Sequence, residues 1–184
     1  MKSTMTSVQP YWVFLIIAEA KGWKIPQKKE VEVRKDYPKA KDWDRTNYIY
    51  CGQNKASFNR IPKEYQPLMR PLLGKVVAEF TCDRINEYDF FIGHGVCGYV
   101  DGCESHCLTR EELVEYGKGK TVYGWHISDL KVYDTTKELG EFYSETGTFA
   151  ENDFGLSTDL GIRYMKYLRR PPQSWFYVEE VSDG

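Results

Sequence analysis

The sequence predicts an α+β fold, mainly β, in the form of a small mixed barrel with short peripheral helices. Strand-like segments recur from the first quarter of the chain to its end, while helical segments are few and short. No repeat of solenoid length and no low-complexity tract is visible. A chain of 184 residues suits one domain. We therefore expect a single domain over residues 1–184.

The first expected helix covers residues 10–21. Pro10 suits the first helical position, and Gly22 suits the C-terminal cap. The first expected strand covers residues 28–35, where polar and apolar residues alternate. This alternation predicts a strand with one buried and one polar face.

The alternation also places the charged residues of this strand. Lys28, Glu32 and Arg34 should share its polar face. Lys29 should fall on the opposite face, together with the valines. A bend or bulge at the start of the strand would be needed to bring Lys29 beside the others.

The remaining elements follow from the same kinds of signal. Further strands are expected at 47–51, 75–82, 125–133 and 173–181, and a proline-containing loop at 61–71. Two short helices should open at capping boxes, Thr109 with Glu112 and Thr135 with Glu138. The acidic, glycine-dotted stretch over about 140–162 is weakly periodic, and we expect a surface insertion or lid there.

Charge is distributed unevenly, although the formal net charge is only −2. Residues 21–41 hold eight Lys or Arg against three acids, and residues 137–160 hold one Lys against six acids. The basic block is compatible with a polyanionic partner, but it also fits a solvated charged hairpin.

The cysteines and apolar runs indicate the compartment. The five Cys are odd in number, and no secretion signal is visible. The apolar run over 12–18 is too short for a membrane span. We expect a cytoplasmic protein with reduced thiols and no membrane partner.

Three stretches of the sequence resemble the ASCH domain, a branch of the PUA-like β-barrel superfamily. They are the Pro-Tyr-Trp helix with the following strand over 28–35, the segment over 74–80, and the segment over 124–130 together with 171–180. The resemblance is closest to a subgroup common in bacteria and their prophages, and it covers residues from about 10 to about 180. It implies a barrel with a cleft beside the first strand. It also implies RNA binding or nucleotide handling. A few relatives hydrolyse acetylated cytidine, and others are ribonucleases.

The resemblance also suggests catalytic residues. The family hydrolases use a lysine at the position of Lys29, and a threonine as nucleophile where this chain has Glu32. The hydroxyl is therefore missing here, which puts an amidohydrolase activity in doubt. Glu32 could instead activate water while Lys29 tunes its charge.

Other side chains are candidates for ligand binding. We expect Lys28, Lys29, Arg34 and Lys35 to contact phosphate, and Glu32 and Gln173 to contact a base edge. Stacking platforms and polar cleft residues complete the set: Trp12, Trp175, His126, Ser128 and Ser174. The alternatives of exposed ion pairs and of core packing stay open for these residues.

A stretch rich in Cys and His could hold a metal. His94, Cys97, Cys103 and Cys107 could form a structural zinc site, although the spacing is not that of paired Cys-x-x-Cys knuckles. Reduced structural thiols on a glycine-rich loop are the alternative. We expect no other cofactor.

Three functions are compatible with these observations. The leading one is an RNA- or nucleotide-binding module that uses a basic cleft to bind single-stranded RNA or a nucleotide. The second is a hydrolase acting on a modified nucleoside or on single-stranded RNA. The third is a phage or host interaction protein that docks a partner through the acidic segment 137–160.

Overall fold

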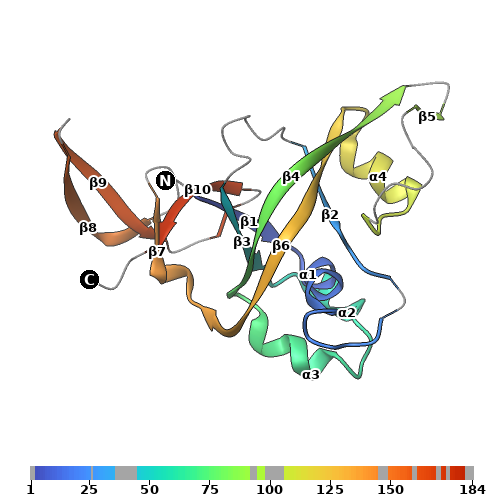
Figure 1. Ribbon diagram of the computed structural model, residues 1–184, viewed down its shortest axis with the longest axis horizontal. Helices are drawn as coiled ribbons and strands as arrows, with labels where there is room; N and C mark the ends of the chain where they lie inside the picture. Colours follow the sequence, from blue (N-terminus) through green and yellow to red (C-terminus); the bar gives the residue numbers. More distant parts are fainter. Residues whose placement is uncertain are drawn as a thin grey trace. The chain divides into compact units, whose positions relative to one another are not determined.

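Two compact units make up the structure, which is a computed structural model (Figure 1). The residues that it describes are 3–25, 27–35, 45–91, 95–97, 106–144, 149–158, 161–168, 171–172 and 175–180. The first unit combines residues 1–14, 45–79 and 131–184, and the second combines residues 15–44 and 80–130. Both units are therefore assembled from segments far apart in sequence.

The first unit contains most of the strands. They are β1 (Ser3–Val8), β3 (Thr46–Cys51), β7 (Phe142–Ser144), β8 (Phe149–Thr158), β9 (Gly161–Leu168) and β10 (Trp175–Glu180). Their order in the sheet is β3-β1-β10-β7-β9-β8. Strand β1 pairs in parallel with β3, and the pairs β1·β10, β10·β7, β7·β9 and β8·β9 are antiparallel. The sheet is therefore mixed.

Short helices accompany these strands: α2 (Lys55–Asn59), α3 (Gln66–Met69), η2 (Arg70–Leu72) and η3 (Leu139–Glu141). The expectation of a loop over 61–71 was wrong in part, because α3 places Pro67 in its first turn, where proline costs no hydrogen bond. The core of the unit joins β1, β3, β7 and β10. Its buried side chains include Met5, Tyr48, Phe142 and Val178.

The second unit is built on β2 (Val31–Arg34), β4 (Val76–Phe91), β5 (Gly95–Cys97) and β6 (Val122–Lys137), in the order β2-β6-β4-β5. Strands β4 and β6 are long and contribute residues to both units. The same is true of α1 (Pro10–Ile17). Helix α4 (Arg110–Gly117) packs in this unit through Leu113, which shares a core cluster with Val33, Tyr88 and Val122.

Several local predictions are confirmed. Pro10 begins α1, and Gly22 ends the following turn with φ +71° while the Trp23 N–H donates to the Ala18 carbonyl (2.8 Å). Thr109 and Glu112 form the expected capping box of α4. The predicted α+β, mainly β class is confirmed. No helix in the described part of the chain is long and apolar enough to span a membrane.

Other local predictions were wrong. Thr135 does not begin a helix but lies within β6, and the short helix η3 is capped by Glu138 with Glu141. The sequence patterns also missed β1, α2, β8 and β9. Residues 149–158 and 161–168 pair as antiparallel strands, where an insertion or lid was expected. Whether this region acts as a lid stays a prediction.

Candidate functional site

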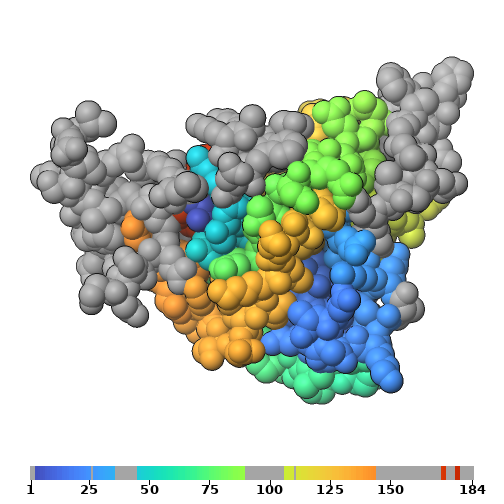
Figure 2. Space-filling view, in the orientation of Figure 1, coloured from blue at the N-terminus to red at the C-terminus, as the bar shows by residue number. Residues whose placement is uncertain are grey.

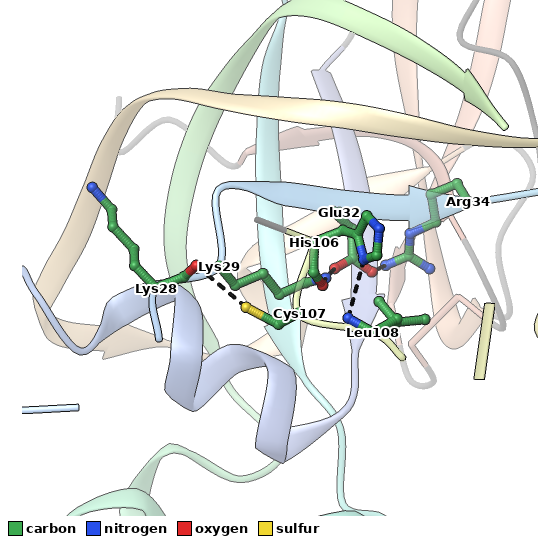
Figure 3. A network of polar contacts seen from close by, with 7 residues as sticks. All are labelled: Lys28, Lys29, Glu32, Arg34, His106, Cys107 and Leu108. Carbon is green, nitrogen blue, oxygen red and sulfur yellow. Dashed lines mark hydrogen bonds and ion pairs between the residues drawn. The ribbon is translucent and has the colours of Figure 1, made fainter. Parts of the chain in front are cut away.

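Three charged side chains meet beside β2 in the second unit (Figure 3). The Lys29 Nζ lies 3.5 Å from Glu32 Oε2, and an Arg34 guanidinium nitrogen lies 3.0 Å from Glu32 Oε1. All three residues are buried, with 2%, 7% and 5% of their surface exposed. We call these residues the Lys29 cluster. The structure thus brings together both predicted catalytic residues and one predicted phosphate ligand.

The strand geometry explains how Lys29 reaches this cluster. Strand β2 pairs with β6 only from Val31 onward, in the register Val31↔His126 to Arg34↔Tyr123. Lys29 precedes the strand, and its N–H donates to the Leu15 carbonyl (3.3 Å). Strand alternation therefore does not fix the direction of Lys29. The expectation that it lies on the opposite face from Glu32 was wrong.

The expectation of a half-buried strand was also wrong, because all four residues of β2 are buried. Lys28 does not join the polar face either. It is 47% exposed at the side chain and pairs with Glu19 and Glu30, and Figure 3 shows it pointing away from Glu32. The hydrogen bond with Glu19 is the main cause of the raised pKa of Lys28.

The segment before α4 holds Lys29 in place. The Lys29 ammonium donates to the His106 carbonyl oxygen (2.8 Å), and the Leu108 N–H donates to His106 Nδ1 (3.0 Å). This second bond leaves the proton of a neutral imidazole on Nε2. The Cys107 thiol donates to the Lys28 carbonyl (3.3 Å). Sequence reasoning did not assign these roles, because His106 contacts Lys29 through its backbone, which no side-chain motif reveals.

Burial dominates the electrostatics of the Lys29 cluster. The pKa of Lys29 is lowered, chiefly because burial removes water from the ammonium group, although the nearby Glu32 acts in the opposite direction. The pKa of His106 is lowered, first by burial and then by the charge of Lys29. Glu32 Oε2 is buried and accepts no hydrogen bond among the described residues. The cluster therefore combines a destabilised lysine charge with a carboxylate oxygen that still has acceptor capacity.

A cavity of about 340 Å³ lies next to Lys29 in the same unit. This volume is at the lower end of the range of about 300–1,000 Å³ that is usual for small-ligand sites. Its lining comes from α1 and the turn after it, from the start of β2 and from β6: Ile16, Glu19, Ala20, Lys28, Lys29, Glu30, Ile127, Asp129 and Leu130. Asp129 has φ +49°, an uncommon value for a residue within a strand. The wall therefore has apolar and charged parts.

Three other candidates lie elsewhere in the second unit. His126, on β6, contacts the carboxylate of Asp83 on β4, which lowers the pKa of Asp83 mainly through this hydrogen bond. Lys35 is exposed, with its ammonium 5.0 Å from the centre of the Tyr116 ring. Ser128 is partly exposed on β6. No contact recorded for these three residues joins them to the Lys29 cluster.

The remaining candidates belong to the first unit or lie outside the described residues. Trp12 is on α1, below the guanidinium of Arg60 (4.7 Å). Trp175 begins β10 opposite Thr6. Gln173 and Ser174 lie outside the described residues.

The proposed zinc ligands are only partly described. His94 and Cys103 lie outside the described residues, Cys97 is placed only as part of β5, and the Cys107 thiol contacts the Lys28 carbonyl. Within the described ranges, no group of three or more His, Cys, Asp or Glu could hold a metal ion. Zinc binding stays a prediction.

The acidic segment 137–160 contains a core residue of the first unit. Phe142 is fully buried and its ring contacts Tyr48 (4.9 Å). A deletion that includes Phe142 would therefore damage the fold as well as any docking surface. Partner binding through this segment stays a prediction, and substituting the exposed Glu138 and Glu141 would test it without that damage.

The fold is similar to that of a solved bacterial protein. A crystal structure of a serine-to-alanine mutant of ZmASCH, from Zymomonas mobilis, aligns over 97% of this chain and 89% of its own, with a TM-score of 0.53 and 15% sequence identity. No family model matches the sequence, and no curated protein matches it. The chain thus has an ASCH-type fold at a level of sequence identity that carries no functional assignment.

Proposed function

We propose that this chain, which shares the fold of ZmASCH, binds a nucleotide or single-stranded RNA at the Lys29 cluster and the neighbouring cavity. The observation that carries the proposal is the convergence of two basic side chains on one buried carboxylate beside a ligand-sized cavity. Glu32 could accept a hydrogen bond from an exocyclic amine, and Arg34 could donate to a base edge or phosphate. The resemblance to ASCH domains supports the same ligand class.

Exposure limits which residues can meet a phosphate in the free protein. Lys28 and Lys35 are exposed, but Lys29 and Arg34 are buried in contact with Glu32. We therefore assign first contact with the backbone to the exposed lysines. Recognition by Lys29 and Arg34 would require the ligand to replace part of their interaction with Glu32, which makes the cluster a selective element.

Salt dependence and one conservative variant test this function. Anisotropy titrations of labelled oligouridine should give an affinity that falls with salt, with a logarithmic slope of about −0.7 for each phosphate contact. Glu32→Gln keeps the size of the side chain but removes its charge, and we expect it to weaken binding about tenfold through the lost charge-assisted contact.

Lys120→Ala is the matched control for this titration, because Lys120 is an exposed lysine outside the cluster. Circular dichroism would check that Glu32→Gln folds. The proposal fails if the protein does not bind RNA or mononucleotides at micromolar concentration. It also fails if the affinity does not depend on salt.

The lowered pKa of Lys29 favours a second candidate, hydrolysis of a modified nucleoside. A neutral lysine amine, or the Glu32 carboxylate, could take a proton from water as the water oxygen adds to an acyl carbon. Breaking the amide bond would then release the carboxylic acid and the nucleoside amine. Water would be the nucleophile, because Glu32 replaces the hydroxyl-bearing residue of the family hydrolases.

Incubation with acetylated cytidine and with labelled RNA, followed by chromatography, tests this candidate. Glu32→Gln and Lys29→Met should each slow product formation at least a hundredfold. Turnover equal to that of the wild type in both variants would remove these residues from the reaction.

A further inference from the structure

The first unit carries an exposed basic surface that includes stacked aromatic rings. It is formed by the start of α1 and by the segment from α2 to η2, which is teal to green in Figure 2 and forms part of the face shown. We call it the Arg60 surface. Its members are Tyr11, Trp12, Lys55, Arg60, Lys63 and Arg70.

Arg60 is the centre of this surface. Its guanidinium carbon lies 4.1 Å from the centre of the Tyr11 ring and 4.7 Å from that of Trp12. The two rings meet edge to face, with their centres 4.9 Å apart. Arg60 is exposed, whereas both rings are only partly exposed. The guanidinium therefore forms an outer layer over the two rings.

Hydrogen bonds hold the backbone that carries this layer. Asn54 caps α2 by accepting from the Ser57 N–H (2.8 Å), and the Arg60 N–H donates to the Ser57 carbonyl (3.1 Å). The Ser57 hydroxyl accepts from the Tyr11 N–H (3.1 Å), which joins α1 to α2. The arginine and the rings beneath it are thus positioned before any ligand arrives, which lowers the entropic cost of binding.

The charge around Arg60 has one predominant sign. Between residues 52 and 74, Lys55, Arg60, Lys63 and Arg70 face a single acid, Glu64, and all five are exposed. Arg70 also lies over an aromatic ring, 5.3 Å from the centre of Phe58. A basic surface that presents planar, stacked groups has the features of a single-stranded nucleic-acid platform, where bases stack and cations meet phosphates.

We propose that the Arg60 surface binds single-stranded RNA, with one base stacked on the outer face of the Arg60 guanidinium and phosphates contacted by Lys55, Lys63 or Arg70. The inference rests on the proposed function, since it takes RNA as the ligand. It adds a surface that contains no residue of the Lys29 cluster. An arginine platform selects unpaired bases without reading their sequence.

Variants of Arg60 separate stacking from charge. For an oligouridine of about 12 nucleotides, we expect Arg60→Ala to weaken binding about tenfold and to reduce the salt slope by about one phosphate contact. Arg60→Lys keeps the charge and should keep the salt slope, yet lose several-fold in affinity because the ammonium group is not planar. An abasic strand of equal length should bind the wild type and Arg60→Lys equally.

Lys120→Ala is again the control of matched charge, and it should leave the affinity unchanged. The inference is overturned if Arg60→Ala binds RNA like the wild type, or if Arg60→Lys is equal to the wild type on oligouridine. In either case, weakened binding by Glu32→Gln would leave the proposed function standing. A wild-type protein that binds no RNA would overturn both.

Discussion

Lys29 is a basic side chain placed where water cannot solvate its charge. Its ammonium is offset by one carboxylate, Glu32, which also contacts the Arg34 guanidinium. Two cations therefore share one anion in a buried site. Such an arrangement costs stability unless each group is hydrogen-bonded, and the His106 carbonyl supplies one of these bonds to Lys29.

The lowered pKa of Lys29 predicts a pH dependence of stability. Between its pKa in the folded state and the ordinary value of 10.5, the unfolded chain binds more protons than the folded one. The contribution of Lys29 to the free energy of unfolding should therefore rise with pH over this range. Urea unfolding of the wild type and of Lys29→Met, from about pH 7 to about pH 10, measures it as their difference.

We expect this difference to move in favour of the wild type as pH increases. Lys120→Met serves as the control, because Lys120 is exposed and has no resolved pKa shift to contribute. Parallel curves for the wild type and Lys29→Met would contradict the assignment of a lowered pKa.

The position of β2 depends on close packing against β6. Gly124, opposite Val33 in this pair, lies where a Cβ would come within 2.6 Å of Val31 Cγ1 and 2.9 Å of the Tyr88 ring. Only glycine leaves space for these side chains. The strand that carries Glu32 and Arg34 is therefore positioned in part by the lack of a side chain on its neighbour.

Gly124→Ala should destabilise the protein by about 1–3 kcal/mol through overpacking. It should also increase hydrogen exchange at the β2 amides, which mass spectrometry of the corresponding peptides would show. Gly140→Ala is the matched control, because Gly140 is exposed and a Cβ there meets no atom within 4 Å. Equal stability of the two variants would show that β2 can shift without cost.

Elements were predictable where a local motif decides them. Thr109 with Glu112 caps α4 as expected, yet Thr135 with Glu138 shows the same spacing and lies partly in β6. A capping box stabilises a helix by about 1 kcal/mol, and pairing within a long strand outweighs it. The local pattern alone could not show which of these applied.

The burial of β2 could not be predicted for a related reason. Its alternation of apolar and charged residues is typical of a half-exposed strand, but Glu32 and Arg34 are buried because they contact each other and Lys29. The resemblance to ASCH domains identified these residues, whereas the roles of His106 and Arg60 depend on contacts between distant segments. Such contacts leave no spacing signal in the sequence.

At the scale of the whole molecule, strand composition predicted the fold class but not the assembly of two discontinuous units. The first unit depends on strands from the two ends of the described chain. Strand β1 pairs with β10 in the register Ser3↔Val178, and Met5 and Val178 share a core cluster. Neither strand can bury its apolar side chains without the other.

A chain truncated after Pro172 should therefore fail to fold to the native state. We expect it to lose near-ultraviolet circular dichroism and cooperative unfolding, because β1 loses one partner and the core loses Val178. Adding a synthetic peptide of residues 173–184 in trans should restore part of the signal. A truncated chain with a native spectrum would show that β10 is dispensable.

The pairing of β1 with β10 also constrains how the protein is made. On the ribosome β1 emerges first, whereas β10 emerges only after nearly all of the described chain has been synthesised. During that interval β1 can pair only with β3, so the first unit stays incomplete until translation has passed residue 180. Completion of this unit is then a late step, and in that period the apolar side chains of β1 are available to chaperones.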